Sequence, residues 1–126
     1  LAYLAGELGA GGAVHFLGHL AYDEMPDVYR AGDALVLPSR AEGMPRTVIE
    51  AMASGTPVVT SDLEQVAPVV ERAGVVVPVG DVEGFAAGLR QVLGGDHGDP
   101  RGVAAEGFDW GETVERTTAV LSQLSL

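Results

Sequence analysis

Hydrophobic positions along the chain follow two patterns, and together they predict strands that alternate with helices. Largely apolar runs at residues 34–37, 57–60 and 75–77 are typical of strands covered on both faces of a sheet. The stretches that follow these runs place apolar residues three and four positions apart, as an amphipathic helix does. Because strands and helices alternate through short loops, right-handed crossovers would make the sheet parallel. The pattern predicts a single α/β domain.

Further elements are predicted before the first of these strands. Residues 1–9 have the pattern of the end of an amphipathic helix. Residues 14–17 are predicted to form a short strand that ends at Gly18. Residues 22–31 are predicted to form a helix with acidic residues in its first turn. The chain has neither an initiator methionine nor the opening strand and glycine-rich turn of a doubly wound sheet. We therefore expect an incomplete domain.

The C-terminal half continues the alternation. Asp62 and Asp81 are the expected N-caps of a short helix and of a longer amphipathic helix. Residues 94–102 are expected to be a loop because glycine, aspartate and proline dominate them. A final helix, expected to pack on the sheet edge or on a partner domain, is predicted by an apolar stripe: Trp110, Val114, Thr117, Leu121 and Leu124.

Composition and charge narrow the classes of function. The 126 residues suffice for one domain with a sizeable core, and 47% hydrophobic but only 6% aromatic residues favour helices packed closely on a sheet. The net charge is −11 and every basic residue is an arginine, so binding of nucleic acid through counterion release is disfavoured. No apolar run reaches the roughly 20 residues that a bilayer requires, and no signal peptide opens the chain. We expect a cytoplasmic protein.

Residues 34–60 carry the candidate chemistry. A strand leads through a loop with Glu42 into a helix that opens near Pro45 and carries Glu50. The first N–H groups of a helix lack intrahelical partners and, with the helix dipole, form a site for a phosphate or diphosphate. Gly43 allows close approach of the backbone. Carboxylates accept hydrogen bonds from hydroxyls, so a phosphate site between two of them suggests a sugar nucleotide.

Four features occur in a fixed order along the chain. They are FLG at 16–18, AGDALVLPSRAEGMP at 31–45, two glutamates separated by seven residues, and EAMASGTPVV at 50–59. Together with VVVPVGD and the helix after it, they resemble the C-terminal, donor-binding domain of group 1 (family 4) retaining glycosyltransferases of the GT-B architecture. The resemblance implies that residues 1–126 are a single Rossmann-like, three-layer domain with a parallel sheet. It also implies that this domain is incomplete and that the N-terminal acceptor-binding domain is missing.

The resemblance implies a role for each residue around the loop. Glu42 is the expected catalytic residue, which would contact hydroxyls of the donor sugar and orient it or stabilise developing positive charge. Glu50 would hold the ribose diol. The other expected donor-binding residues are Gly43, Met44 and Pro45 near the sugar, the main chain of Arg46, Thr47 and Val48 near the diphosphate, and Gly18, His19 and Leu20 near the base. Such enzymes transfer the sugar from a nucleotide-diphosphate donor with retention, and neither a metal nor a cofactor is expected.

Three departures from the family pattern weaken the expectation of activity. The basic pair that grips the diphosphate would lie before residue 1, as would the acceptor-binding domain. Pro68 stands about where a Gly-Gly-x-x-Glu pattern would place a glutamate. We therefore expect the isolated chain to bind a nucleoside diphosphate weakly and to transfer no sugar. The alternative is a non-catalytic nucleotide- or phosphate-binding module, or a partner domain of the same fold, and a sugar-nucleotide epimerase is a more distant candidate.

Simpler interpretations remain open for single residues, and the partners follow from the family. Glu42, Glu50, Arg46 and His19 could each be an ordinary solvated side chain.

The expected partners are a nucleotide-diphosphate sugar and the missing acceptor domain. A peripheral contact with a membrane is expected only through that missing domain. The missing opening strand would expose a sheet edge, so the isolated chain is expected to oligomerise or to exchange strands.

Overall fold

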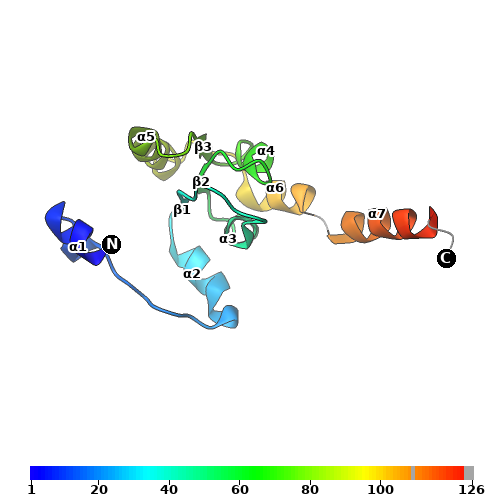
Figure 1. Ribbon diagram of the computed structural model, residues 1–126, viewed down its shortest axis with the longest axis horizontal. Coiled ribbons are helices and arrows are strands. Elements are labelled where there is room, and N and C mark those ends of the chain that lie inside the picture. Colours follow the sequence, from blue (N-terminus) through cyan, green and yellow to red (C-terminus); the bar gives the residue numbers. More distant parts are fainter. Residues whose placement is uncertain (109, 124–126) are drawn as a thin grey trace.

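A parallel sheet of three strands lies at the centre of the molecule (Figure 1). The computed structural model describes residues 1–108 and 110–123, without the side chains of residues 110 and 113. The strands are β1 (Leu35–Leu37), β2 (Val58–Ser61) and β3 (Val75–Val77), in that spatial order. Leu35 pairs with Val58, and Val59 pairs with Val75. Within the described residues, no strand lies on the outer edge of β1.

Helices cover both faces of this sheet, which gives the domain three layers. Helix α5 (Val82–Leu93) covers one face, where Val59, Val77 and Val92 are buried together. The other face carries the main hydrophobic core, to which four helices contribute: α2 (Met25–Ala31), α3 (Arg46–Ala53), α4 (Ala67–Val70) and α6 (Pro100–Gly107). The predicted α/β architecture with a parallel sheet is confirmed.

Helix α3 connects β1 to β2, and its position decides where the candidate site lies. It buries Val48 and Met52 in the main core. Pro45, expected at the opening of the helix, is its N-cap residue. At the other end Gly55 adopts a φ of 88°, and its N–H donates to the carbonyl oxygen of Met52 at 2.9 Å. The first turn of α3 directly follows the loop that leaves the carboxyl end of β1, so the candidate site lies at that end of the sheet.

Helix α5 is built as its sequence predicts. Oδ1 of Asp81 accepts a hydrogen bond from the N–H of Gly84 at 2.9 Å, which confirms the expected N-cap. Gly88 lets the helix approach the sheet closely, because a Cβ there would lie 3.0 Å from a methyl carbon of both Val59 and Val75. The smaller core therefore depends on a glycine at the position where α5 faces Val59 and Val75, beside the buried side chain of Val92.

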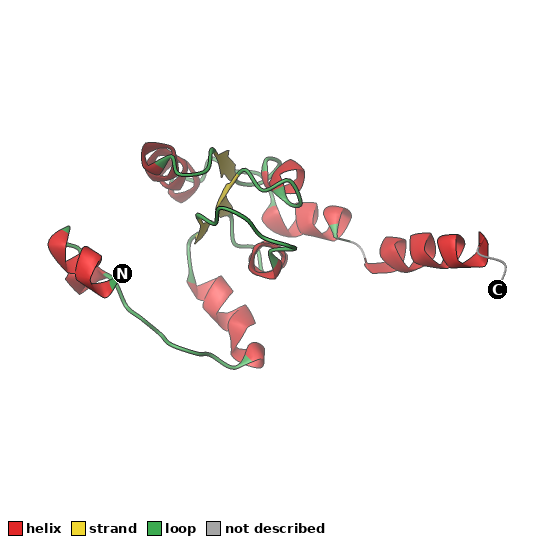
Figure 2. Cartoon of the chain, in the orientation of Figure 1, coloured by secondary structure: helices red, strands yellow, loops and turns green. Residues whose placement is uncertain are grey.

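The predicted strand at residues 14–17 is wrong. These residues lie in a long extended segment between the short 3-10 helices η1 (Gly11–Ala13) and η2 (Tyr22–Glu24) (Figure 2). The backbone of Val14 is extended, but Phe16 and Leu17 are 61% and 65% exposed. A strand forms only where a neighbour completes its backbone hydrogen bonds. The apolar pattern is present here without that neighbour.

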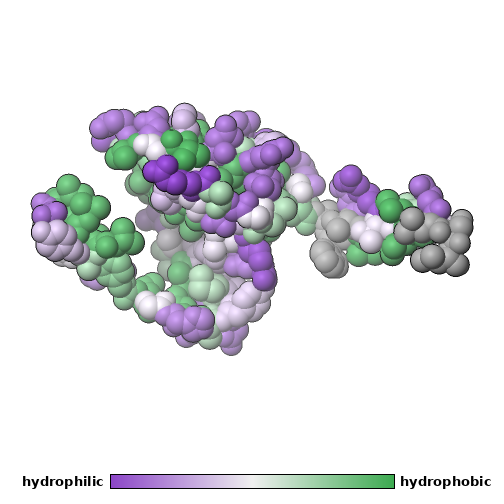
Figure 3. All heavy atoms as spheres, viewed as in Figure 1, coloured by the Kyte–Doolittle hydropathy of each residue, from purple (hydrophilic) through white to green (hydrophobic). Residues whose placement is uncertain are grey.

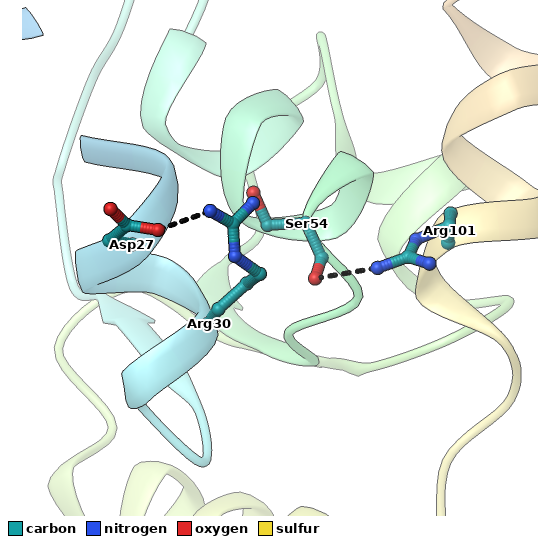
Figure 4. A network of polar contacts seen from close by, with 4 residues as sticks. All are labelled: Asp27, Arg30, Ser54 and Arg101. Atoms are coloured by element: carbon teal, nitrogen blue, oxygen red, sulfur yellow. Dashed lines mark hydrogen bonds and ion pairs between the residues drawn. The ribbon is translucent and has the colours of Figure 1, made fainter. Parts of the chain in front are cut away.

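The glycine-rich segment at residues 94–102 is only partly the predicted loop, because α6 begins at Pro100. Proline suits the first turn of a helix, where its missing N–H costs no hydrogen bond. Helix α6 packs on α3 and buries Val103 and Ala104 in the main core. A guanidinium N–H of Arg101 also donates to the carbonyl oxygen of Ser54 at the end of α3, at 3.2 Å (Figure 4). Tertiary packing thus forms a helix where local composition favours a loop.

Both ends of the chain project from the body (Figure 1). The N-terminal arm, residues 1–20, begins with α1 (Ala2–Glu7), and Figure 3 shows hydrophobic side chains gathered on it. Helix α7 (Trp110–Gln123) points away from the sheet and does not pack on its edge, whereas the other expected partner of this helix, a further domain, stays a prediction. Its Val120 and Leu121 are each 60% exposed. The Trp110 side chain and Leu124, which belong to the predicted stripe, lie outside the described residues.

Candidate functional site

The loop after β1 presents Glu42 to solvent. Oε1 of Glu42 accepts a hydrogen bond from the Ser39 hydroxyl at 2.8 Å, within the same loop. Oε2 has no hydrogen-bond partner among the described residues. Next to it, a Cβ added at Gly43 would meet no atom within 4 Å, and the side chain of Met44 is exposed. The loop therefore leaves open space around one held carboxylate.

The start of α3 presents two backbone N–H groups without a partner. No side chain caps the helix, and the N–H of Val48 donates to the carbonyl oxygen of Pro45 at 3.1 Å. The N–H groups of Arg46 and Thr47 make no hydrogen bond in the described part of the chain. With the helix dipole, two unpaired N–H groups favour an anion at this point. The expected phosphate contact is therefore available from Arg46 and Thr47, whereas the Val48 N–H is already used.

Glu50 lies one turn further along α3 and is held from two sides. The hydroxyl of Tyr29 donates to Oε2 of Glu50 at 2.9 Å. The Arg46 guanidinium lies 3.9 Å from Oε1 of Glu50, on the solvent side, where the Arg46 side chain is 73% exposed. The side chain of Glu50 itself is 28% exposed. Glu50 is thus a partly buried carboxylate, with one oxygen hydrogen-bonded to Tyr29 and the other facing the exposed Arg46 guanidinium.

A cavity of about 320 Å³ opens beside Glu50, between α2 and α3. Its lining is mostly apolar or aromatic, with two carboxylates: Tyr22, Asp23, Met25, Pro26, Tyr29, Glu50, Ala53 and Ser54. The Arg46 guanidinium lies 5.9 Å from the centroid of the Tyr22 ring, at the rim of this space. A volume of this size with a few polar groups suits part of a small organic ligand.

The environment of Tyr29 fixes its protonation state. Burial, then the hydrogen bond to Glu50 and the negative charge of that carboxylate, raise the pKa of Tyr29 from 10.0 to about 12. Only 6% of Tyr29 is exposed. The phenol therefore stays protonated at neutral pH and acts as a hydrogen-bond donor to Glu50.

The structure brings together only part of the predicted site. Residues 42–50 lie in one loop and the helix after it, as expected. Gly18, His19 and Leu20, expected near a base, lie on the N-terminal arm, and none of them lines the cavity beside Glu50. Tyr22 and Tyr29 line it instead, and neither was predicted. The sequence did contain one signal for Tyr29, which lies at a position on the apolar face of its helix. A phenol hydroxyl that is buried there needs a hydrogen-bond partner, and that requirement points to a nearby polar group.

Two kinds of feature are not found in the described residues. No group of three or more histidine, aspartate or glutamate side chains is arranged to hold a metal ion. None of the described helices combines the length and the apolar character needed to cross a membrane.

Comparison with known proteins finds several relatives of this chain. The O-antigen chain mannosyltransferase B of Escherichia coli is 33% identical over 111 residues, which cover 84% of this chain and 29% of that protein. The glycogen synthase of Mycobacterium tuberculosis is 36% identical over 115 residues, covering 85% of this chain and 28% of that protein. The D-inositol 3-phosphate glycosyltransferase of Gordonia bronchialis is 36% identical over 129 residues, covering 97% of this chain and 28% of that protein. This chain spans less than a third of the length of these three relatives.

A solved structure and a family match agree with these relatives. The sucrose-phosphate synthase of Thermosynechococcus elongatus superposes with a TM-score of 0.81 at 27% identity, over 97% of this chain and 33% of that one. The fold is the Rossmann-like α/β domain of GT-B glycosyltransferases. Residues 2–94 match the family described as group 1 glycosyl transferases. Because the match covers most of the sequence, the chain belongs to the group 1 glycosyl transferases.

Proposed function

We propose that this chain is the donor-binding part of a glycosyltransferase and that it holds a nucleotide-diphosphate sugar along the start of α3. The observation that carries the proposal is the placement, on one helix, of two free N–H groups at Arg46 and Thr47 and of the Glu50 carboxylate. A helix rises 1.5 Å per residue, so about 5 Å separates the two features along its axis. A single nucleoside diphosphate spans that distance, with its phosphates at the N–H groups and its ribose diol at Glu50.

Glu42 is the proposed catalytic residue. Its Oε2 has no hydrogen-bond partner among the described residues, and the space beside the neighbouring Gly43 is open, so the sugar attached to the distal phosphate would lie there. The carboxylate would orient the sugar hydroxyls and stabilise positive charge as the bond from the anomeric carbon to the phosphate oxygen breaks. The acceptor oxygen would bond the anomeric carbon on the same face, and the acceptor proton would pass to the leaving phosphate. Retention of configuration follows from attack on that face.

Arg46 supports the phosphate site in a second way. It is the one basic residue in the first turn of α3, and its exposed guanidinium makes only the long contact to Glu50 and a contact with the Tyr22 ring. An arginine so loosely held can turn to a phosphate, which it binds through two parallel hydrogen bonds. We propose no metal ion and no cofactor for donor binding.

Titration of the isolated chain with UDP, GDP and ADP, followed by nuclear magnetic resonance, tests donor binding. We expect shifts of the amide signals of residues 42–50 with at least one of the three nucleotides, and the same shifts when a chelator is present. The variant Glu50→Gln is expected to weaken binding about tenfold or more, since a hydrogen bond to a charged group contributes about 1.5–3 kcal/mol. Glu83→Gln, on the exposed first turn of α5, is the matched control. If the amide signals of residues 42–50 shift with none of the three nucleotides, the proposal is excluded.

The second candidate is a non-catalytic nucleotide-binding module. The observation in its favour is that, among the described residues, Arg46 is the only cation at the start of α3. The isolated chain is expected to bind without transferring sugar under either proposal. Donor turnover separates them: a longer natural chain that includes an upstream acceptor domain transfers sugar if the first proposal is correct and remains inactive if the second is.

A further inference from the structure

Tyr29 connects α2 to α3 through two hydrogen bonds at opposite ends of the residue. Its carbonyl oxygen accepts from the Thr56 hydroxyl at 2.6 Å, just beyond the end of α3, and both groups are buried. Its own hydroxyl donates to Oε2 of Glu50 at 2.9 Å. The ring between these two groups belongs to the main core and is 6% exposed. Tyr29 is therefore fixed at its main chain and its ring before its hydroxyl reaches Glu50.

The contact with Tyr29 limits the freedom of Glu50. A glutamate side chain has three rotatable bonds, and in a partly exposed position it loses up to about 2 kcal/mol of conformational entropy when it is fixed. Among the described residues, the only other polar contact of Glu50 is the 3.9 Å approach of the exposed Arg46, which is too long for a hydrogen bond. The orientation of the Glu50 carboxylate thus depends on the Tyr29 hydroxyl.

A fixed carboxylate is what recognition of a diol requires. Two adjacent hydroxyls need two acceptor positions at a set distance and angle, and each ionised carboxylate oxygen has two lone pairs. Tyr29 occupies one position on Oε2, which leaves the second position on Oε2 and both on Oε1, with the Arg46 guanidinium 3.9 Å from Oε1. Glu50, which lines the cavity, therefore keeps three acceptor positions for a ligand.

We propose that Tyr29 is a positioning residue, which orients Glu50 so that the carboxylate selects a ribose over a deoxyribose nucleotide. The inference rests on the proposed function, because it assigns Glu50 to the ribose diol. Tyr29 would act on the ribose through Glu50, to which its hydroxyl donates. The phenol of a tyrosine is protonated at neutral pH, so the Tyr29 hydroxyl is the donor in its contact with Glu50.

The variant Tyr29→Phe tests the inference, because it removes the hydroxyl and keeps the buried ring. The measurement is the ratio of the affinities of the chain for a ribonucleoside diphosphate and for its 2′-deoxy counterpart. In the unaltered chain we expect a clear preference for the ribonucleotide. In Tyr29→Phe we expect this preference to fall about tenfold, equal to about 1.4 kcal/mol, while the affinity for the deoxynucleotide stays within about twofold. Tyr3→Phe, on the exposed α1, is the control and should preserve the ratio.

A second variant keeps the negative charge at residue 50 and shortens its side chain. Glu50→Asp shortens the side chain by one methylene, so its carboxylate no longer meets the Tyr29 hydroxyl, and we expect it to lose the ribose preference as Tyr29→Phe does. A preserved preference in Tyr29→Phe would overturn the inference, as would an equal loss of affinity for both nucleotides, which marks a structural role. If the unaltered chain binds no nucleotide, the proposed function fails and the inference fails with it. If it binds nucleotides and Tyr29→Phe keeps the ratio while Glu50→Asp loses it, only the inference fails. If both variants keep the ratio, the assignment of Glu50 to the ribose diol fails as well.

Discussion

At the residue scale, the site depends on how single polar groups are held in a chain without lysine or cysteine. Glu42 is held by Ser39 and Glu50 by Tyr29, each through a hydroxyl that donates to one oxygen of the carboxylate. The other carboxylate oxygens remain available to a ligand. Each glutamate is thus preoriented by a neutral donor, and Glu50 has in addition the Arg46 guanidinium 3.9 Å from its Oε1.

The raised pKa of Tyr29 gives a prediction for alkaline stability. A group with a pKa raised in the folded state stabilises the fold fully below its unfolded pKa, and this contribution is lost as the pH rises through the folded pKa. For Tyr29 the window lies between the ordinary value of 10.0 and about 12. We expect the free energy of unfolding to fall across this window by about 2–3 kcal/mol more in the unaltered chain than in Tyr29→Phe.

Denaturant unfolding at a series of pH values measures this difference. The chain suits the experiment because it contains no lysine and no cysteine, whose side chains would otherwise titrate in the same range. Tyrosinate absorbance during an alkaline titration provides an independent reading. Parallel stability curves for the two proteins between pH 10 and 12 would contradict the prediction.

At the scale of elements, the sequence predicts what is encoded locally and misses what depends on a distant partner. The three strands, α3 and the Asp81 cap of α5 follow from apolar runs and from one capping residue. Residues 14–17 have an equally good apolar pattern but no neighbouring strand. Helix α6 has poor local composition, yet its packing on α3 forms it. Likewise, the spacing of Glu42 and Glu50 is visible in the sequence, whereas the bond from Tyr29 to Glu50 links residues 21 positions apart.

Gly74 offers a test of how closely β3 approaches β2. A Cβ at residue 74 would lie 2.2 Å from the carbonyl oxygen of Val58, so the backbone itself would have to move. We expect Gly74→Ala to lower the free energy of unfolding by about 3 kcal/mol, near the upper end for overpacked sites. Thermal unfolding of the variant measures this loss.

Gly12→Ala is the matched control for this substitution, because a Cβ at Gly12 would meet no atom within 4 Å and the residue has no positive φ. Its melting temperature should stay close to that of the unaltered chain. An equal effect of the two substitutions would show that β3 can shift away from β2 at little cost.

At the scale of the whole molecule, several surfaces lack a partner among the described residues, and they lie on more than one side of the sheet. The outer edge of β1 carries unpaired backbone groups, and Val36 on that strand is 39% exposed. The N-terminal arm adds Phe16 and Leu17 at 61% and 65% exposure. A net charge of −11 repels a second copy of the chain at low ionic strength. Association therefore depends on salt and on concentration.

We predict that the isolated chain self-associates as its concentration rises, and more strongly when salt screens its charge. Static light scattering over a range of protein and salt concentrations measures the effect. Phe16→Glu, which adds a charge to the exposed arm, should weaken association, whereas Glu7→Gln on α1 should not. A monomer at high concentration in high salt would contradict the prediction.

The unpaired edge of β1 also decides what kind of crevice can form beside Glu42. The chain leaves β1 through α3 toward β2, on one side only. If an earlier segment of a longer chain placed a strand on the other side of β1, the connections from two adjacent strands would run in opposite directions, which makes a topological switch point. Open α/β sheets bind their ligands in the crevice at such points. Extension of the sheet at this edge would then turn an exposed loop into one wall of a binding cleft without changing a residue of that loop.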